Sequence, residues 1–244
     1  MRRPILIWTF RRSGGTSLAR LLFAHAATPH WQDEALNPDR ELGAVTRAFR
    51  ETGDAAALEA ALATSMVAGK SLKHCLDTVP FPVSSRLLRA AGGHAHMLLL
   101  RLGEADRLIS LALAQQTGAW GRAEASGLQE RLRSGALRLA PLERKTIREQ
   151  GTRDAATLGR FLRLAFARRL PLATVFFEDL FTGEAAARIA AYRGLAESLG
   201  LDLEGLPEAV LKRHLFDAAQ ESPAIADFVP NIDEIRRVID RFTN

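Results

Sequence analysis

The stretch that decides the fold reads Ile5-Leu6-Ile7-Trp8-Thr9-Phe10, followed by Arg11-Arg12-Ser13-Gly14-Gly15-Thr16-Ser17. The first six residues form a continuous apolar run rich in strand formers. Such a run predicts a strand covered on both faces, as in a parallel sheet. After the glycines, Leu18, Leu21 and Leu22 repeat at the spacing of a helix. The predicted order is therefore strand, glycine turn, helix.

Outward from this stretch, strand and helix patterns alternate along the chain. Further strands are predicted at residues 67–72, 96–100 and 172–177. Helices are predicted at 41–51, 54–66, 84–91, 106–117, 184–199 and 231–242, and within 122–170 with breaks near Gly135 and Pro141. The alternation predicts an α/β fold: a central parallel sheet flanked by helices, with helical insertions. We expect residues 1–244 to form a single domain.

Composition limits the functional classes. Hydrophobic residues make up 47% and charged residues 25% of the 244 residues, which is typical of a globular protein. The net charge of +5 suits an anionic ligand. Nucleic acid is not expected as a partner, because the arginines are spread along the chain rather than massed in one run.

Cellular location is predicted from three features. Cys75 is the sole cysteine, so a disulfide within the chain is excluded and a reducing cytoplasm is expected. The apolar run at 4–10 meets Arg11 and Arg12 directly, so we interpret it as a strand rather than a signal peptide. No run reaches the roughly 20 apolar residues of a membrane span.

The turn at 11–17 has the chemistry of an anion site. Gly14 and Gly15 allow close approach of the backbone, and the amides of a helix N-terminus face the ligand. Hydroxyls and positive charge are added by Ser13, Thr16, Ser17, Arg11 and Arg12. The loop is P-loop-like, but it lacks the lysine of an ATP-hydrolysing P-loop and the glycine spacing of a dinucleotide fold. The alternative is a tight turn with a basic flank.

A second group of residues carries a family resemblance. Leu100-Arg101, Ser110 and Gln116-Thr117-Gly118-Ala119-Trp120 resemble the sulfotransferases that use 3′-phosphoadenosine 5′-phosphosulfate (PAPS), and most closely the bacterial group typified by trehalose 2-sulfotransferase. Residues 12–16 resemble the Arg-Ser-Gly-Ser-Thr loop of that family, with Gly15 in place of serine. Residues 177–180 and 199–201 resemble two of its structural elements, with Phe177 in place of tyrosine.

The resemblance implies a function and its residues. PAPS would donate a sulfuryl group in line to an acceptor hydroxyl, with residues 11–17 at its 5′ end and Arg101 and Ser110 at its 3′-phosphate. Arg12 would stabilise the leaving charge, and Glu34 would take the acceptor proton. His30 and His74 are rival bases, and Glu34 is equally well read as an exposed loop acid. No metal is expected.

Several questions stay open on the sequence. The acceptor is a carbohydrate, a small molecule or a lipid alcohol, and the oligomeric state is not indicated. The alternatives are a P-loop kinase using ATP and an inactive protein that binds anions. The basic segment 160–169 suits contact with a membrane surface, but we expect its apolar residues to face the core and its arginines to face solvent.

Overall fold

The computed structural model describes residues 3–26, 28–203, 209, 211, 215 and 225–243. The chain divides into two compact units. The first combines Met1–Leu100 with Ala156–Ala218, and the second combines Arg101–Ala155 with Ala219–Asn244. Each unit has its own buried core and is described separately.

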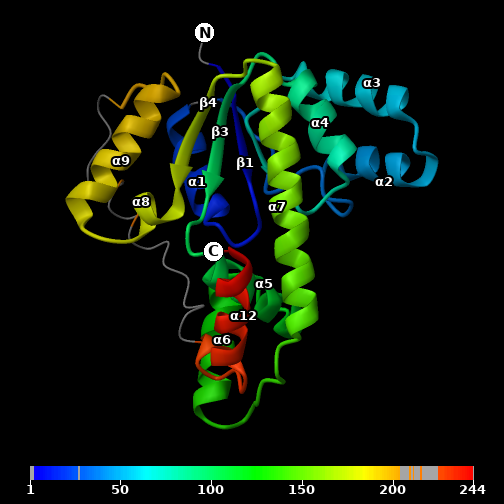
Figure 1. The fold of residues 1–244 in the computed structure, drawn as a ribbon. Coiled ribbons are helices and arrows are strands. Elements are labelled where there is room, and N and C mark those ends of the chain that lie inside the picture. The colour runs from blue at the N-terminus through cyan, green and yellow to red at the C-terminus, as the bar shows by residue number, and fades with distance from the viewer. Residues whose placement is uncertain are drawn as a thin grey trace. The chain divides into compact units, whose positions relative to one another are not determined.

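The first unit is built on a parallel sheet. Its strands are β1 (Ile5–Thr9), β2 (Leu72–Cys75), β3 (Ala95–Leu100) and β4 (Leu172–Phe176). Their order is β2-β1-β3-β4, and all three neighbouring pairs are parallel (Figure 1). The predicted fold class, α/β with a central parallel sheet flanked by helices, is therefore confirmed, and the sheet is consistent with a P-loop-like fold.

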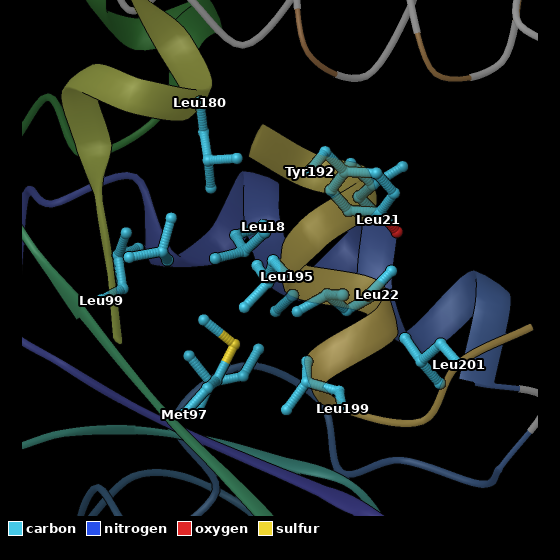
Figure 2. Close-up of a cluster of buried hydrophobic side chains, with 14 of the residues drawn as sticks. Leu18, Leu21, Leu22, Met97, Leu99, Leu180, Tyr192, Leu195, Leu199 and Leu201 are labelled. Carbon is cyan, nitrogen blue, oxygen red and sulfur yellow. The ribbon is translucent and has the colours of Figure 1, made fainter. Parts of the chain in front are cut away.

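Helices cover both faces of this sheet. The helices of the first unit are α1 (Gly15–Ala26), α2 (Gly43–Thr52), α3 (Ala55–Met66), α4 (Phe81–Ala90), α8 (Phe177–Phe181) and α9 (Ala185–Ser198). On one face, Leu18, Met97 and Tyr192 belong to a continuous apolar cluster with α1 and α9 (Figure 2). A strand covered on both faces can be apolar throughout, which explains the unbroken run at β1.

The opposite face of the sheet packs against α3, α4 and the second half of α7 (Arg144–Ala167). Trp8 is fully buried there and lies 4.8 Å from Phe161, ring centroid to ring centroid. Its indole Nε1 donates to Nδ1 of His96 at 3.1 Å, so the polar atom of this large side chain is satisfied. Burial lowers the pKa of His96 to about 4, which keeps the ring neutral at physiological pH.

The second unit is helical. It contains α5 (Glu104–Thr117), α6 (Arg122–Arg133), the first half of α7 and α12 (Ile232–Thr243). Leu108, Leu128 and Ile235 belong to its apolar cluster. Arg107 on α5 is buried and binds Glu104 at 2.6 Å and Asp154 of α7 at 2.5 Å, which ties the two helices together.

Most predicted elements are found, but two predictions are wrong. Residues 67–72 were expected to be a strand, yet β2 begins only at Leu72 and Gly69 adopts a φ of 61° in the preceding turn. A left-handed glycine ends extended structure, so the strand starts after it. Phe177 was placed in the fourth strand, whereas it is the first residue of α8. In the part of the chain that the structure describes, no helix is both long and apolar enough to cross a membrane.

Candidate functional site

The loop between β1 and α1 lies where the sequence placed the anion site. The first hydrogen bond of the helix runs from the amide of Leu18 to the carbonyl of Gly14 at 3.1 Å. The three amides before Leu18 are therefore not used by the helical ladder and are available to a ligand. Arg12 is held at a φ of 67°, a conformation that costs a side chain on the order of 1–3 kcal/mol. Such strain is concentrated at functional loops.

The two glycines are required for different reasons. Gly14 has a φ of 80°, and a Cβ there would lie 2.7 Å from Cδ2 of Phe177. Gly15 begins α1, and a Cβ there would lie 2.9 Å from Cγ2 of Thr9 and 3.4 Å from Cδ of Lys73. The loop backbone therefore packs directly against Phe177 and Thr9, and this close packing fixes the shape of the loop without a ligand.

Ser13 gives the loop an unsatisfied donor. Ser13 is 1% exposed, and its Oγ has no hydrogen-bond partner among the described residues. Buried hydroxyls in native proteins are normally paired, so an isolated one at a loop of free amides suggests a missing ligand oxygen. The observation fits the phosphosulfate end of PAPS, and equally any phosphate-like group.

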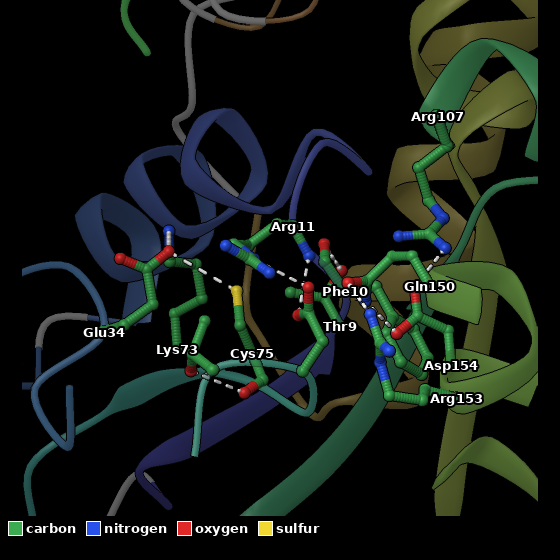
Figure 3. Close-up of polar contacts among 12 residues, drawn as sticks. Thr9, Phe10, Arg11, Glu34, Lys73, Cys75, Arg107, Gln150, Arg153 and Asp154 are labelled. Carbon is green, nitrogen blue, oxygen red and sulfur yellow. Dashed lines mark hydrogen bonds and ion pairs between the residues drawn. The ribbon is translucent and has the colours of Figure 1, made fainter. Parts of the chain in front are cut away.

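Lys73 reaches this loop from β2. It is not among the site residues predicted from the sequence. Its ammonium donates to Oγ1 of Thr16 at 2.6 Å. It also lies 2.6 Å from Oε1 of Glu34 (Figure 3). The side chain is 3% exposed, so the charge is held in a nearly dry environment. The expected catalytic acid and one expected loop hydroxyl are thus brought together by a third residue.

Glu34 is ionised in this arrangement. Burial by itself raises the pKa of Glu34, but the charge and hydrogen bond of Lys73 outweigh it, and the Cys75 thiol, which donates at 3.4 Å, adds to them. The net pKa is below the ordinary value of 4.5. The interpretation of Glu34 as a merely exposed loop acid is not favoured, because its side chain is only 20% exposed and has specific partners.

Arg11, the first arginine of the loop, is anchored by a buried aspartate. Arg11 is committed to Asp77: its amide donates to Oδ1 at 3.1 Å and its Nε to Oδ2 at 2.7 Å. The Asp77 side chain is 1% exposed, so this pair anchors the start of the loop to the turn after β2. Arg11 therefore has a structural task in addition to the positive charge that it brings.

A pocket opens beside the Lys73–Glu34 pair. Its volume is about 280 Å³, close to the lower end of the range of about 300–1,000 Å³ for small-molecule sites. The lining includes Thr16, Arg20, Phe23, His30, Trp31 and Lys73. One face of the Trp31 ring is covered by the ammonium of Lys70, 3.8 Å from the ring centroid. The pocket thus combines aromatic walls with the groups that the loop presents.

The two histidines proposed as rival bases lie in different places. His30 is exposed and lines the pocket. His74 is 1% exposed, bonds through Nε2 to Oγ of Ser84 at 2.9 Å, and contacts Trp8 on the opposite face of the sheet from α1. Burial lowers the pKa of His74 to about 4. The structure does not bring His74 to the loop.

Arg101 and Ser110 belong to the second unit. Arg101 follows β3 directly, its side chain is 14% exposed, and its Nη2 lies 3.9 Å from Asp106. Glu104, another acid close to Arg101 in the sequence, binds Arg107. Ser110 is 4% exposed on α5. The serine expected on a helix after β3 therefore lies on α5, and Arg101 directly follows β3.

Restoring the serine of the resembling family at position 15 tests the packing of the loop. Gly15→Ser is expected to lower the free energy of unfolding by about 1–3 kcal/mol, because the added Cβ overpacks against Thr9. Urea unfolding measures the change. The double variant Thr9→Ser/Gly15→Ser removes the methyl group in the way and should recover most of the loss. A Gly15→Ser protein as stable as the parent would contradict this close packing.

Among the described residues, no group of three or more histidine, cysteine, aspartate or glutamate side chains is arranged to hold a metal ion. No protein-family model, curated protein or solved structure matched the chain.

Proposed function

We propose that the chain is a sulfotransferase that moves a sulfuryl group from PAPS to an acceptor hydroxyl. The observation that carries the proposal is the buried ammonium of Lys73, held between Thr16 of the glycine loop and the carboxylate of Glu34. A fixed cation, free helix amides and a carboxylate at one point suit transfer of an anionic group to a nucleophile that must lose a proton. The resemblance in sequence favours PAPS as the donor.

In this proposal the loop binds the 5′ end of the donor. The amides of the first turn of α1, the hydroxyl of Ser13 and the guanidinium of Arg12 would face the phosphosulfate. The acceptor oxygen forms a bond to sulfur while the bond from sulfur to the bridging oxygen breaks in line. Lys73 and Arg12 stabilise the negative charge that the 5′-phosphate gains as it leaves.

Glu34 would take the proton of the acceptor hydroxyl. In the structure Lys73 lowers the pKa of Glu34, which makes the carboxylate a weak base. A negatively charged donor near the ammonium would draw Lys73 toward itself and weaken its hold on Glu34. The base would then become stronger only when the donor is bound, so that proton removal from the acceptor would be favoured once the sulfuryl group is in place.

The pocket is the proposed acceptor site. Aromatic side chains suit the apolar face of a sugar ring or of a small alcohol, and the volume admits one such group rather than a long chain. The carbohydrate and small-molecule alternatives are therefore favoured over a lipid alcohol buried along its length. The cytoplasmic location stays a prediction.

Calorimetric titration with adenosine 3′,5′-bisphosphate, ATP and ADP, each with and without Mg²⁺, tests the proposal. Micromolar binding of the bisphosphate without metal, and none of ATP, is expected. ATP binding that requires Mg²⁺ would favour the kinase alternative. Binding of the bisphosphate without transfer of label from PAPS, either to water as sulfate or to any of a panel of alcohols as a sulfate ester, would favour the inactive anion-binding alternative.

The 3′-phosphate contact is tested by Arg101→Ala. A hydrogen bond to a charged group contributes about 1.5–3 kcal/mol, so the affinity for the bisphosphate should fall on the order of ten- to a hundredfold. Turnover at saturating PAPS should change far less. ADP lacks the 3′-phosphate and is the matched ligand control: its affinity should not change. An unaltered bisphosphate affinity would remove Arg101 from the donor site.

A further inference from the structure

The amino-terminal edge of the sheet is basic. Because all four strands are parallel, the segments that lead into them meet at this edge, opposite the glycine loop. Residues 3–4, 67–71, 91–94 and 168–171 make up these segments, and they contain no aspartate or glutamate. They contribute Arg3, Lys70, Arg168 and Arg169. Figure 1 shows this edge at the top, where α7 ends and β4 begins.

Exposed apolar side chains occur at the same edge. Val67, in the turn before β2, is 86% exposed, and Phe166, in the last turn of α7, is 88% exposed. Leu162 is 40% exposed and precedes Phe166 by four residues, so both lie on one face of α7. The expectation that the apolar residues of 160–169 face the core is therefore only half right: Phe161 and Ala165 are buried, whereas these two are not.

The end of α7 adds further positive charge around this apolar face. From Ala155 to Phe177 the sequence has four arginines and no acid. The arginines are Arg160, Arg163, Arg168 and Arg169. Within the described part of the chain none of their side chains forms an ion pair with a carboxylate. Their charge is thus available to an external anion.

We propose that this edge docks reversibly on a membrane surface that contains anionic lipid. Phe166, Leu162 and Val67 would enter the boundary between headgroups and acyl chains, and the arginines would contact lipid phosphates. A free polyanion such as RNA would use the charge but not the exposed apolar side chains. A second copy of the chain is disfavoured as the occupant, because the two basic edges would repel each other.

The geometry leaves the glycine loop accessible while the protein is docked. The loop follows the carboxyl end of β1, and the proposed docking edge lies at the amino ends of the strands. Docking would concentrate the protein at the bilayer with its candidate anion site facing water. This inference does not depend on the proposed sulfotransferase function, since it uses a different edge of the sheet.

Vesicle co-sedimentation of the full chain tests the proposal. Vesicles of phosphatidylcholine with phosphatidylserine are compared with vesicles of phosphatidylcholine alone, at low and high salt. Binding is expected only with phosphatidylserine, and it should weaken as salt is raised. Arg163→Gln/Arg168→Gln should lower the partition coefficient about tenfold or more, and Phe166→Ser several-fold, without changing the melting temperature, because all three side chains are exposed.

The matched control is Arg131→Gln/Arg138→Gln, which removes the same charge from exposed positions of the second unit and should leave partitioning unchanged. Three results would overturn the proposal. The first is no binding to phosphatidylserine vesicles at low salt. The second is an equal loss in the control variant, which would indicate only net charge. The third is full vesicle binding by Phe166→Ser, which would indicate a general polyanion surface.

Discussion

Replacing Lys73 with methionine is expected to lower sulfuryl transfer at saturating PAPS by about 10²–10³-fold, the loss typical of removing one donor that stabilises developing charge. Methionine keeps the apolar stem that passes Gly15 and removes only the ammonium. Thr16 and Glu34 then lose their shared partner. Transfer of label from PAPS, to sulfate with water or to a sulfate ester with an alcohol, measures the rate. Bisphosphate titration measures the remaining donor affinity.

Lys70→Met is the matched control for this experiment. Lys70 carries the same charge three residues earlier, but its ammonium lies over the Trp31 ring rather than on the glycine loop. Its replacement should change the rate by a few-fold at most. The double variant Glu34→Gln/Lys73→Met leaves no unpaired charge and separates loss of folding from loss of chemistry. A Lys73→Met protein with the rate of the parent would assign Lys73 a purely structural role.

Glu34→Gln is expected to lower turnover by about 10²–10⁴-fold while bisphosphate affinity is kept, because a general base acts on the acceptor proton and not on the donor. Glutamine retains the size of the side chain and a carbonyl oxygen for Lys73 and Cys75. Parallel rate and titration measurements on the same preparation provide the comparison. Turnover equal to that of the parent would exclude Glu34 as the base.

Asp39→Asn is the control, since Asp39 is a nearby acid outside the pocket lining, its side chain is 77% exposed and its ion pair with Arg40 spans 3.7 Å. It should leave turnover nearly intact. The pH profile gives a second readout. Because the pKa of Glu34 is lowered in the free protein, its stabilising pair with Lys73 is lost only as the pH falls through that lowered value. With the donor bound the hold of Lys73 on Glu34 is weaker, so the rate should be lost at a higher pH than the pair. Glu34→Gln should remove this acid limb of the rate profile.

The sequence was sufficient for the strand, turn and helix at residues 5–26. A short unbroken apolar run can be either a buried strand or part of a buried helix. Here Gly14 and Gly15 follow the run, and leucines at helical spacing follow the glycines, so only the order strand, turn, helix fits. Both glycines prove to be sterically required. The same logic placed β3 correctly, because its run also ends at a recognisable break.

Lys73 could not be identified in the same way. A charged residue in a four-residue strand weakens the strand pattern, and the strand predicted at residues 67–72 ended before Lys73. The function of Lys73 depends on its register opposite Ile7 in β1, which sets its side chain toward α1. Strand pairing of this kind is a tertiary property, so the local sequence Leu72-Lys73-His74 did not single out the lysine.

The support of Gly14 by Phe177 has a consequence for how the protein is made. The glycine loop leaves the ribosome early, whereas the aromatic ring against which Gly14 packs belongs to α8 and follows only after most of the chain. At a translation rate of about 5–20 residues per second, the gap lasts roughly ten seconds or more. During that time the nascent chain contains the glycine loop but not the Phe177 ring against which Gly14 packs. We therefore expect the glycine loop to reach its final shape late in synthesis, and a nascent chain that stalls before α8 to lack the side chain that supports Gly14.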